Sequence, residues 1–101
     1  MGIVISKNIS GSGGVGGVGK EAITINIDAS VSSQIVIVPD ANGADEIRVY
    51  RKIDATLNTV TLQPEIIGQK INDEVAWVLE AQGQYISIDA ENGHWWIIGN
   101  N

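Results

Sequence analysis

Apolar and polar side chains alternate with a period of two over much of the chain after residue 21. In residues 22–28 (AITINID), isoleucines at positions 23, 25 and 27 alternate with Thr, Asn and Asp. Such alternation is typical of a β-strand with one buried face. No segment carries the sustained amphipathic pattern of a helix. The pattern therefore predicts an all-β chain from this region onward.

A different kind of strand is predicted at residues 35–38 (IVIV), which are apolar at every position and end before Pro39. A short, continuous apolar run that stops at a proline is typical of a strand buried on both faces. We therefore expect both faces of this strand to be covered. Residues 39–43 (PDANG) follow with turn-forming residues.

The next alternating run has one apolar face and one polar face. Ile47, Val49 and Ile53 share the apolar face, which is the face expected to be buried. Tyr50 and Lys52 share the opposite face.

Short strands and turns continue to the end of the chain. Asn92 and Gly93 form a strong hairpin signal, because both residues tolerate a positive φ. Many short strands with closely spaced turns predict a small antiparallel β-sandwich or barrel-like domain. Further strands are predicted at residues 58–62, 75–80, 85–88 and 94–98.

The N-terminal residues 1–20 differ in character from the β domain, which spans residues 21–101. Residues 11–19 (GSGGVGGVG) are so dense in glycine that their backbone entropy disfavours a strand or helix, and they indicate a flexible linker. We interpret the region as a flexible N-terminal arm whose apolar patch anchors the domain, by adding a strand to another protein's sheet. The alternative is a frayed N-terminus. The patch consists of Ile3, Val4 and Ile5.

Net charge and composition narrow the classes of function. The formal net charge is -6, and an acidic surface repels phosphate backbones and anionic lipids. We therefore expect no nucleic-acid partner and no membrane partner. The absence of cysteine excludes disulfides and thiolate ligands or nucleophiles. A chain of 101 residues fits one domain of modest burial, which oligomerisation would increase.

Two glycine patterns are similar to phosphate-binding loops. Residues 14–20 satisfy G-x-x-x-x-G-K, and residues 11–16 satisfy G-x-G-x-x-G. However, Glu21 stands where magnesium binding requires Ser or Thr. Both motifs also need a helix to follow them, whereas a strand pattern follows here. We therefore interpret both as parts of the linker and expect no cofactor.

Other candidate chemistry is weak. Asp40, Asn42, Asp45 and Glu46 cluster in one loop, and closely spaced oxygen ligands can hold calcium. The full calcium-loop pattern is missing, so a solvated turn is the preferred interpretation. His94 is the only histidine, and no motif such as G-x-S-x-G marks a nucleophile. We expect no metal site, no catalytic residue and no enzymatic activity.

The aromatic residues form a candidate contact surface. Trp95 and Trp96 are adjacent in a predicted strand, so one side chain enters the core and the other lies outside or at an interface. With Tyr50 and Tyr85, they could pack against a neighbouring subunit or stack on a sugar ring. We favour the subunit contact.

Six short blocks in the second half of the chain occur in a recognisable order. They are residues 49–54 (VYRKID), 58–62 (NTVTL), 71–73 (IND), 77–79 (WVL), 84–88 (QYISI) and 92–99 (NGHWWIIG). This order resembles a module of tailed-phage fibre, head-fibre and capsid-decoration proteins, which runs from a Lys-Lys-Ile-Asp strand to a terminal Asn-Trp-Tyr-Ile-Ile-Gly. Arg51 here replaces one Lys, Asp73 stands where Gly is usual, and Trp96 takes the place of Tyr.

The resemblance implies a homotrimeric structural module that projects from a virion and has no catalytic role. It also implies that the strands around Tyr85 and Trp95 help to build the trimer. Together with the N-terminal arm, it favours a head fibre or capsid-decoration protein on the capsid surface. Its partner would be the major capsid protein or another virion protein. The alternative is a tail-fibre or receptor-binding tip that binds a host surface glycan.

Overall fold

The computed structural model describes residues 2–9 and 21–101, and these residues form eight β-strands and no helix. The prediction of an all-β chain is confirmed. The predicted glycine linker lies outside the described residues. Within them, nothing forms a helix with the length and apolarity needed to cross a membrane. The strands are β1 (Gly2–Ile9), β2 (Glu21–Asp28), β3 (Gln34–Val38), β4 (Glu46–Lys52), β5 (Val60–Pro64), β6 (Trp77–Leu79), β7 (Tyr85–Glu91) and β8 (His94–Asn100).

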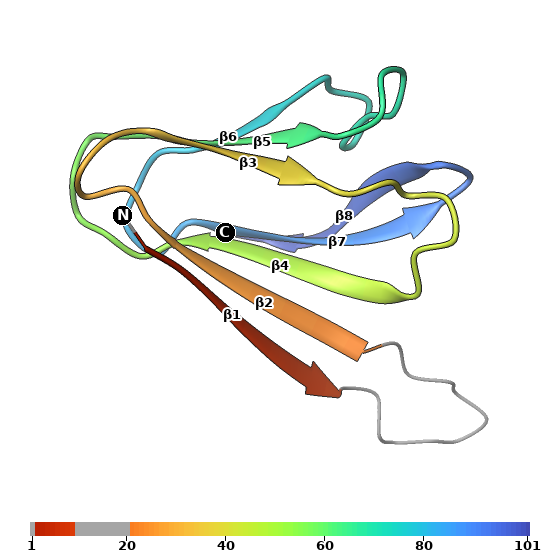
Figure 1. The fold of residues 1–101 in the computed structure, drawn as a ribbon, viewed down its shortest axis with the longest axis horizontal. Helices are drawn as coiled ribbons and strands as arrows, with labels where there is room; N and C mark the ends of the chain where they lie inside the picture. The colour runs from red at the N-terminus through yellow and green to blue at the C-terminus, as the bar shows by residue number, and fades with distance from the viewer. Residues whose placement is uncertain (1, 10–20) are drawn as a thin grey trace.

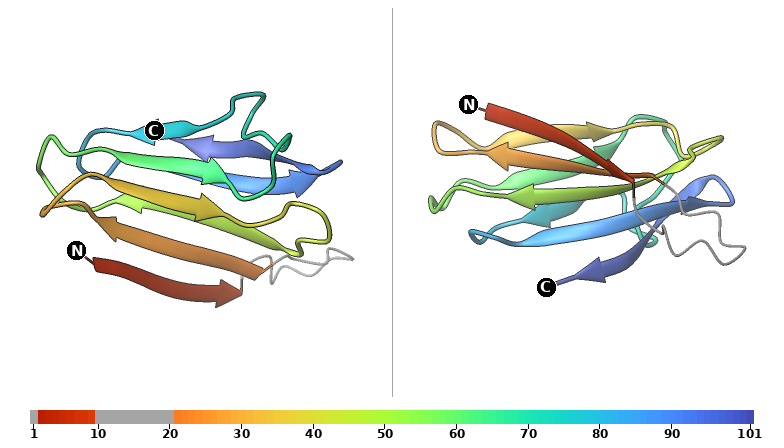
Figure 2. Two further views of the ribbon diagram at one scale, coloured as in Figure 1. Left: turned by 45° about the horizontal axis from the view of Figure 1, so that its top comes forward. Right: turned by 90° about the horizontal axis from the view of Figure 1, so that it is seen from below.

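The described strands form two sheets that pack face to face as a sandwich (Figure 1). The larger sheet has the order β1-β2-β4-β7-β8, and the smaller sheet has the order β3-β5-β6. Figure 2 shows the smaller sheet above the larger one in its left view, and the outer face of the larger sheet in its right view. Of the two architectures predicted, a sandwich or a barrel-like domain, the described strands form the sandwich.

Strand direction follows from the way the chain crosses between the sheets. It runs from β2 in the larger sheet to β3 in the smaller, returns to β4 in the larger, and crosses again to β5. Two strands of one sheet that are separated in the chain by a single strand of the other sheet therefore point the same way, and the pairs β2–β4 and β3–β5 are parallel. The predicted antiparallel arrangement is wrong for these two pairs, because alternation of side chains does not indicate which sheet a strand joins. It is right for β1–β2, β4–β7, β5–β6 and β7–β8.

The hydrophobic core lies between the two sheets and draws on both. Each large apolar side chain that is fully buried there contributes roughly 1.5–3 kcal/mol. The predicted inward face of β2 is confirmed, since Ile25 and Ile27 are buried and Ile23 packs against the core. The other core residues from strands are Val36, Val38, Tyr50, Val60, Leu62, Leu79, Ile86, Ile88 and Trp95.

Strand β4 turns its more polar face to the core. Tyr50 and Lys52 are buried, whereas Ile47 and Val49 lie on the outer face and are only half-buried. The expected burial of the apolar face is therefore wrong. Register explains the result, because Tyr50 is paired on both sides with buried isoleucines of β2 and β7. The ring of Tyr50 supplies a large apolar surface, and Lys52 is neutralised by Asp54.

The predicted hairpin at Asn92 and Gly93 is confirmed. It joins β7 to β8, with φ angles of 55° at Asn92 and 77° at Gly93. Two successive positive φ angles are typical of the type I′ turn that matches the twist of a hairpin. A Cβ atom at Gly93 would lie 3.2 Å from Oδ1 of Asn42, so glycine also allows a neighbouring loop to approach.

A second tight turn, at Asn72 and Asp73, has the same backbone character. Its φ angles are 52° and 68°, and Ile71 and Glu74 exchange two backbone hydrogen bonds of 2.9 and 2.8 Å across it. The resemblance described above would place glycine at position 73, where this chain has aspartate. The turn therefore has the conformation that suits glycine while carrying an aspartate, which tolerates a positive φ less well than glycine does.

Replacing Asp73 by glycine is expected to raise the free energy of unfolding by about 0.5–1 kcal/mol. Relief of the left-handed conformation outweighs the roughly 0.4–1 kcal/mol that glycine adds to the unfolded-state entropy. Urea denaturation would measure the change. Asp45 is the matched control, because it is exposed and has no positive φ. Glycine at Asp45 should lower stability, and equal losses at both positions would contradict the interpretation.

Candidate interaction surface

The smaller sheet leaves one face of an apolar strand exposed. In β3, Val36 and Val38 point into the core, whereas the side chains of Ile35 and Ile37 are 68% and 53% exposed. The expectation that both faces of this strand are covered is therefore wrong. The strand is apolar on both faces, but nothing in the described part of the chain covers its outer face.

The exposed face continues across the sheet. Ile35 pairs in register with Thr61 of β5, which in turn pairs with Val78 of β6, and Val78 is also exposed. One row of paired side chains, Ile35, Thr61 and Val78, therefore crosses all the strands of this sheet on its outer side. Ile37 pairs with Gln63 in the next row. The outer side chains of both rows are uncharged.

A hollow of ≈ 190 Å³ extends this face beyond the end of β5. Gln63 lies at its border, and exposed Ile66, Ile67 and Val75 contribute apolar walls. Gln69 also lines the hollow, but its amide is occupied: Nε2 donates to Asp40 Oδ1 at 2.6 Å, and Oε1 accepts the Ala41 N–H at 2.9 Å. The lining residues are Gln63, Pro64, Ile66, Ile67, Gly68, Gln69 and Val75.

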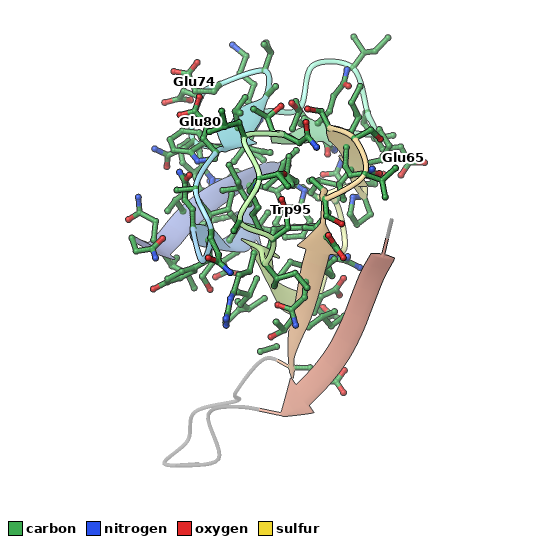
Figure 3. The ribbon with its side chains drawn as sticks, turned by 90° about the vertical axis from the view of Figure 1, so that its left-hand side faces the viewer. Glu65, Glu74, Glu80 and Trp95 are labelled. Carbon is green, nitrogen blue, oxygen red and sulfur yellow. The ribbon has the colours of Figure 1, made fainter. Side chains whose placement is uncertain are left out.

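Acidic side chains lie around this region. Glu65, Glu74 and Glu80 are exposed, and Figure 3 shows them on the periphery of the smaller sheet, with Glu65 on the opposite side from the other two. We call the exposed residues Ile35, Ile37, Ile66, Ile67, Val75 and Val78 the apolar face.

Two of the predicted surface aromatics lie in the interior instead. Trp95 is fully buried between the sheets (Figure 3), and its Nε1 donates to the Pro39 carbonyl at 2.9 Å. Tyr50 is 1% exposed, and its hydroxyl accepts a 3.4 Å hydrogen bond from Arg48. Burial raises the pKa of Tyr50, and the nearby Arg48 opposes that rise. Neither ring is available to a ligand or a second subunit, which corrects the expectation for both residues.

Trp96 and Tyr85 lie on the outer face of the larger sheet and are half-buried. The predicted division of the tryptophan pair between core and exterior is confirmed. Trp96 Nε1 donates to the Glu91 carbonyl at 3.1 Å. Its ring packs edge-on against the ring of His94, with 6.3 Å between the ring centroids. Trp96 pairs with Asp89, four residues from Tyr85 along β7, which corresponds to roughly 13 Å. The two rings therefore do not form one platform for a single sugar.

The predicted anchor residues Ile3, Val4 and Ile5 lie in β1. Their backbones pair with Ile27, Asn26 and Ile25 of β2, in antiparallel register. β1 is the end strand of the larger sheet, and no described strand pairs with its second edge.

The most enclosed charged group is Lys52, which sequence analysis placed on an outer face. Its Nζ donates to Asp54 Oδ2 at 2.7 Å and to the carbonyls of Asp54 and Thr56 at 3.0 and 2.9 Å. Asp54 also accepts the Ala29 N–H at 2.7 Å and both the N–H and the hydroxyl of Thr56. Burial alone would raise the pKa of Asp54, but the hydrogen bonds from Lys52 and Thr56 outweigh it and hold that pKa well below its ordinary value. This network joins the loops at one end of the sandwich.

In the acidic loop considered for calcium, Asp40 and Glu46 use side-chain oxygens in contacts within the chain. Asp40 Oδ1 accepts the Asn42 N–H at 2.8 Å as well as the Gln69 amide, and these bonds, that of Gln69 first, lower the pKa of Asp40. Glu46 forms a 2.9 Å ion pair with Arg48. Residues 2–9 and 21–101 contain no group of three or more His, Asp or Glu that could hold a metal ion.

No family model, curated protein or solved structure matches the chain. Sequence analysis missed the apolar face as a site, although part of its signal was visible. Four consecutive apolar residues at 35–38 indicate that both faces of a strand are apolar. Their second face was assigned to burial within the chain, because the number of layers was unknown.

Proposed function

We propose that the protein is a non-enzymatic structural protein of a phage virion, either a head fibre or a capsid-decoration protein. The observation that carries this proposal is the apolar face, because large exposed apolar patches mark sites of protein contact. In this proposal, the β domain forms a homotrimer that projects from the capsid surface. Residues 1–20 attach it to the major capsid protein or another virion protein.

The resemblance to phage modules supports the proposal, because its residues occupy positions on which this fold depends. Lys52 and Asp54 form the buried ion pair, Asn92 and Gly93 form the hairpin turn, and Trp95 fills the core. A resemblance carried by exposed residues alone would not bear on the fold. The block order therefore favours a shared architecture.

The state of the ionisable groups favours a structural role over catalysis. A catalytic site needs an accessible acid, base or nucleophile, usually in a cleft and with a perturbed pKa. Asp54 has a strongly lowered pKa, but Lys52, Thr56 and a backbone amide enclose it. His94 Nδ1 accepts the Lys70 N–H at 3.2 Å, which ties this side chain to the neighbouring loop.

Attachment through the N-terminal region is compatible with the position of β1. An end strand can accept a strand of another protein on its second edge, which is the β-augmentation mode of recognition. In that arrangement, β1 stays paired with β2 while it binds the shell. Residues 1–10 would then link the capsid to the larger sheet.

The proposal is tested by locating the chain on virions. Particles purified from lysates of the organism that encodes it should carry the chain, and gold-labelled antibody against residues 21–101 should mark the capsid surface. Purified protein lacking residues 1–10 should remain folded by circular dichroism and fail to bind particles that bind the full chain. Label on tails alone would support the tail-fibre alternative, and absence of the chain from all particles would overturn the proposal.

A further inference from the structure

We propose that copies of this chain associate through the apolar face, the outer side of the smaller sheet. The inference deepens the proposed function and rests on it for the number of copies. The surface itself follows from the geometry. Exposed Ile35 and Val78 are the two ends of a row of paired residues that crosses the sheet. Ile37 is paired with Gln63, which also lines the hollow at the end of β5.

The size of the apolar face suits a subunit contact. Its six side chains expose on the order of 600 Å², the upper end of the roughly 300–600 Å² typical for the largest apolar patch on a monomer. A stable interface buries about 800 Å² on each partner. Thr61 and Gln63 lie within the same outline and supply further area. The face therefore supplies most of the area that one subunit contact needs.

Charge favours a second copy over a basic partner. The chain carries a net charge of -6, so two copies repel each other unless they meet through uncharged surfaces. The apolar face has no charged member, and its intervening Thr61 and Gln63 are also neutral. A basic partner would be recognised by carboxylates within the contact. Here Glu65, Glu74 and Glu80 lie at the periphery, where they stay hydrated when two copies meet (Figure 3).

The edge of β3 provides an independent argument for coverage. β3 is the end strand of the smaller sheet, and none of the other described strands pairs with its second edge. Natural proteins protect such edges with charged residues, bulges or a covering element. The strand reads QIVIV and has no charge, and its register with β5 is regular. An open apolar edge beside an open apolar face is protected when another copy packs over both.

The test is the mass in solution of the full chain and of matched variants. Light scattering after gel filtration should give a multiple of the 10.7 kDa chain mass, three for the proposed trimer. Ile37→Glu should reduce that mass to one chain, because it places like charges in the contact. Ile98→Glu is the matched comparison. Ile98 is 57% exposed, close to the 53% of Ile37, but lies in β8 of the larger sheet, where the resemblance to phage modules would instead place the trimer contact. That variant should keep the wild-type mass.

A second measurement does not depend on disrupting the contact. The chain has no cysteine, so single cysteines can be labelled without background. Thr61→Cys lies within the apolar face, and Ser87→Cys lies on the outer face of the larger sheet; both positions are half-buried in the protomer. Maleimide should label Cys at 61 at least about tenfold more slowly than Cys at 87, and dilution that dissociates the oligomer should abolish the difference.

The outcomes separate this inference from the proposed function. Two results would show that the oligomer forms through another surface: equal labelling rates at positions 61 and 87, or an Ile37→Glu variant that is folded and still oligomeric. Either result would overturn the apolar face as the contact but would not affect the proposed trimer. A monomeric wild-type chain at all concentrations would overturn both the contact and the trimer. Detection on virions is a separate result and is unaffected by either. If Ile37→Glu unfolds, the labelling rates decide.

Discussion

Replacement of Trp95 by alanine is expected to lower the free energy of unfolding by about 3–5 kcal/mol, as for other fully buried aromatic residues. The indole fills the space between the sheets, and its N–H satisfies the Pro39 carbonyl. Its backbone also donates to Lys70 and accepts from Asn72, which ties β8 to the loop before β6. Since domains typically have about 5–15 kcal/mol of stability, the loss is a large fraction of the total. Urea denaturation followed by circular dichroism would measure it.

The neighbouring tryptophan provides a matched control. Trp96 is also a tryptophan of β8, but it lies half-buried on the outer face. Trp96→Ala is expected to cost about 1 kcal/mol, near the average for point mutations. The loss of stability for Trp95→Phe should lie between those of Trp95→Ala and Trp96→Ala. Phenylalanine keeps most of the buried ring and leaves only the Pro39 carbonyl without its donor. Equal losses for Trp95→Ala and Trp96→Ala would contradict the assignment of Trp95 to the core.

Replacement of Lys52 by methionine is expected to lower stability by about 3–5 kcal/mol, the usual result of removing one partner of a buried ion pair. Methionine has nearly the length of lysine, so the apolar stem keeps its packing and little cavity forms. What is lost is the ammonium group, with its hydrogen bonds to Asp54 and to the carbonyl of Thr56. Thermal and urea unfolding would both report the change.

Two comparisons make the Lys52 experiment specific. Lys70→Met removes a lysine that is exposed, and it should change stability by no more than about 0.5 kcal/mol. In the double variant Lys52→Met with Asp54→Asn, part of the loss should be recovered, because the buried carboxylate is no longer unpaired. A double variant less stable than the sum of the single changes would argue against a paired charge.

The single variant Lys52→Met should also change how the free energy of unfolding responds to acid. In the folded protein the pKa of Asp54 lies below its ordinary value of 3.8. Its stabilising effect is therefore fully present well above that value and is lost as the pH falls below it. Without Lys52, less of this depression remains, so stability should fall less steeply in acid than in the wild type. A steeper fall would contradict the sign of the argument.

Local features of this fold could be predicted because their causes are local. The alternation around Ile25 and Ile27 indicated a half-buried strand, since side chains of a strand point to opposite faces. Asn92 and Gly93 indicated a hairpin, since few residues tolerate two positive φ angles in succession. The placement of Trp95 in the core and Trp96 on the outer face agrees with the rule that adjacent strand residues point to opposite faces.

Features that depend on other segments could not be predicted in this way. The core face of β4 depends on its register with β2 and β7, and on a charge partner for Lys52 two residues further along. The exposure of Ile35 and Ile37 depends on the number of layers in the fold, which an apolar run does not encode. The parallel pairing of β2 with β4 depends on where the chain crosses between sheets.

That repeated crossing also governs when the chain can fold during its synthesis. β4 pairs with β2, made earlier, and with β7, which is made only after β5 and β6. β3 likewise waits for β5, because its partner strand follows β4 in the chain. The larger sheet is therefore complete only after β7 and β8 have been made, whereas the smaller sheet needs no strand beyond β6. The apolar segment at 35–38 therefore has no partner strand until residues 60–64 have been made, and unpaired strands of this kind are prone to aggregation.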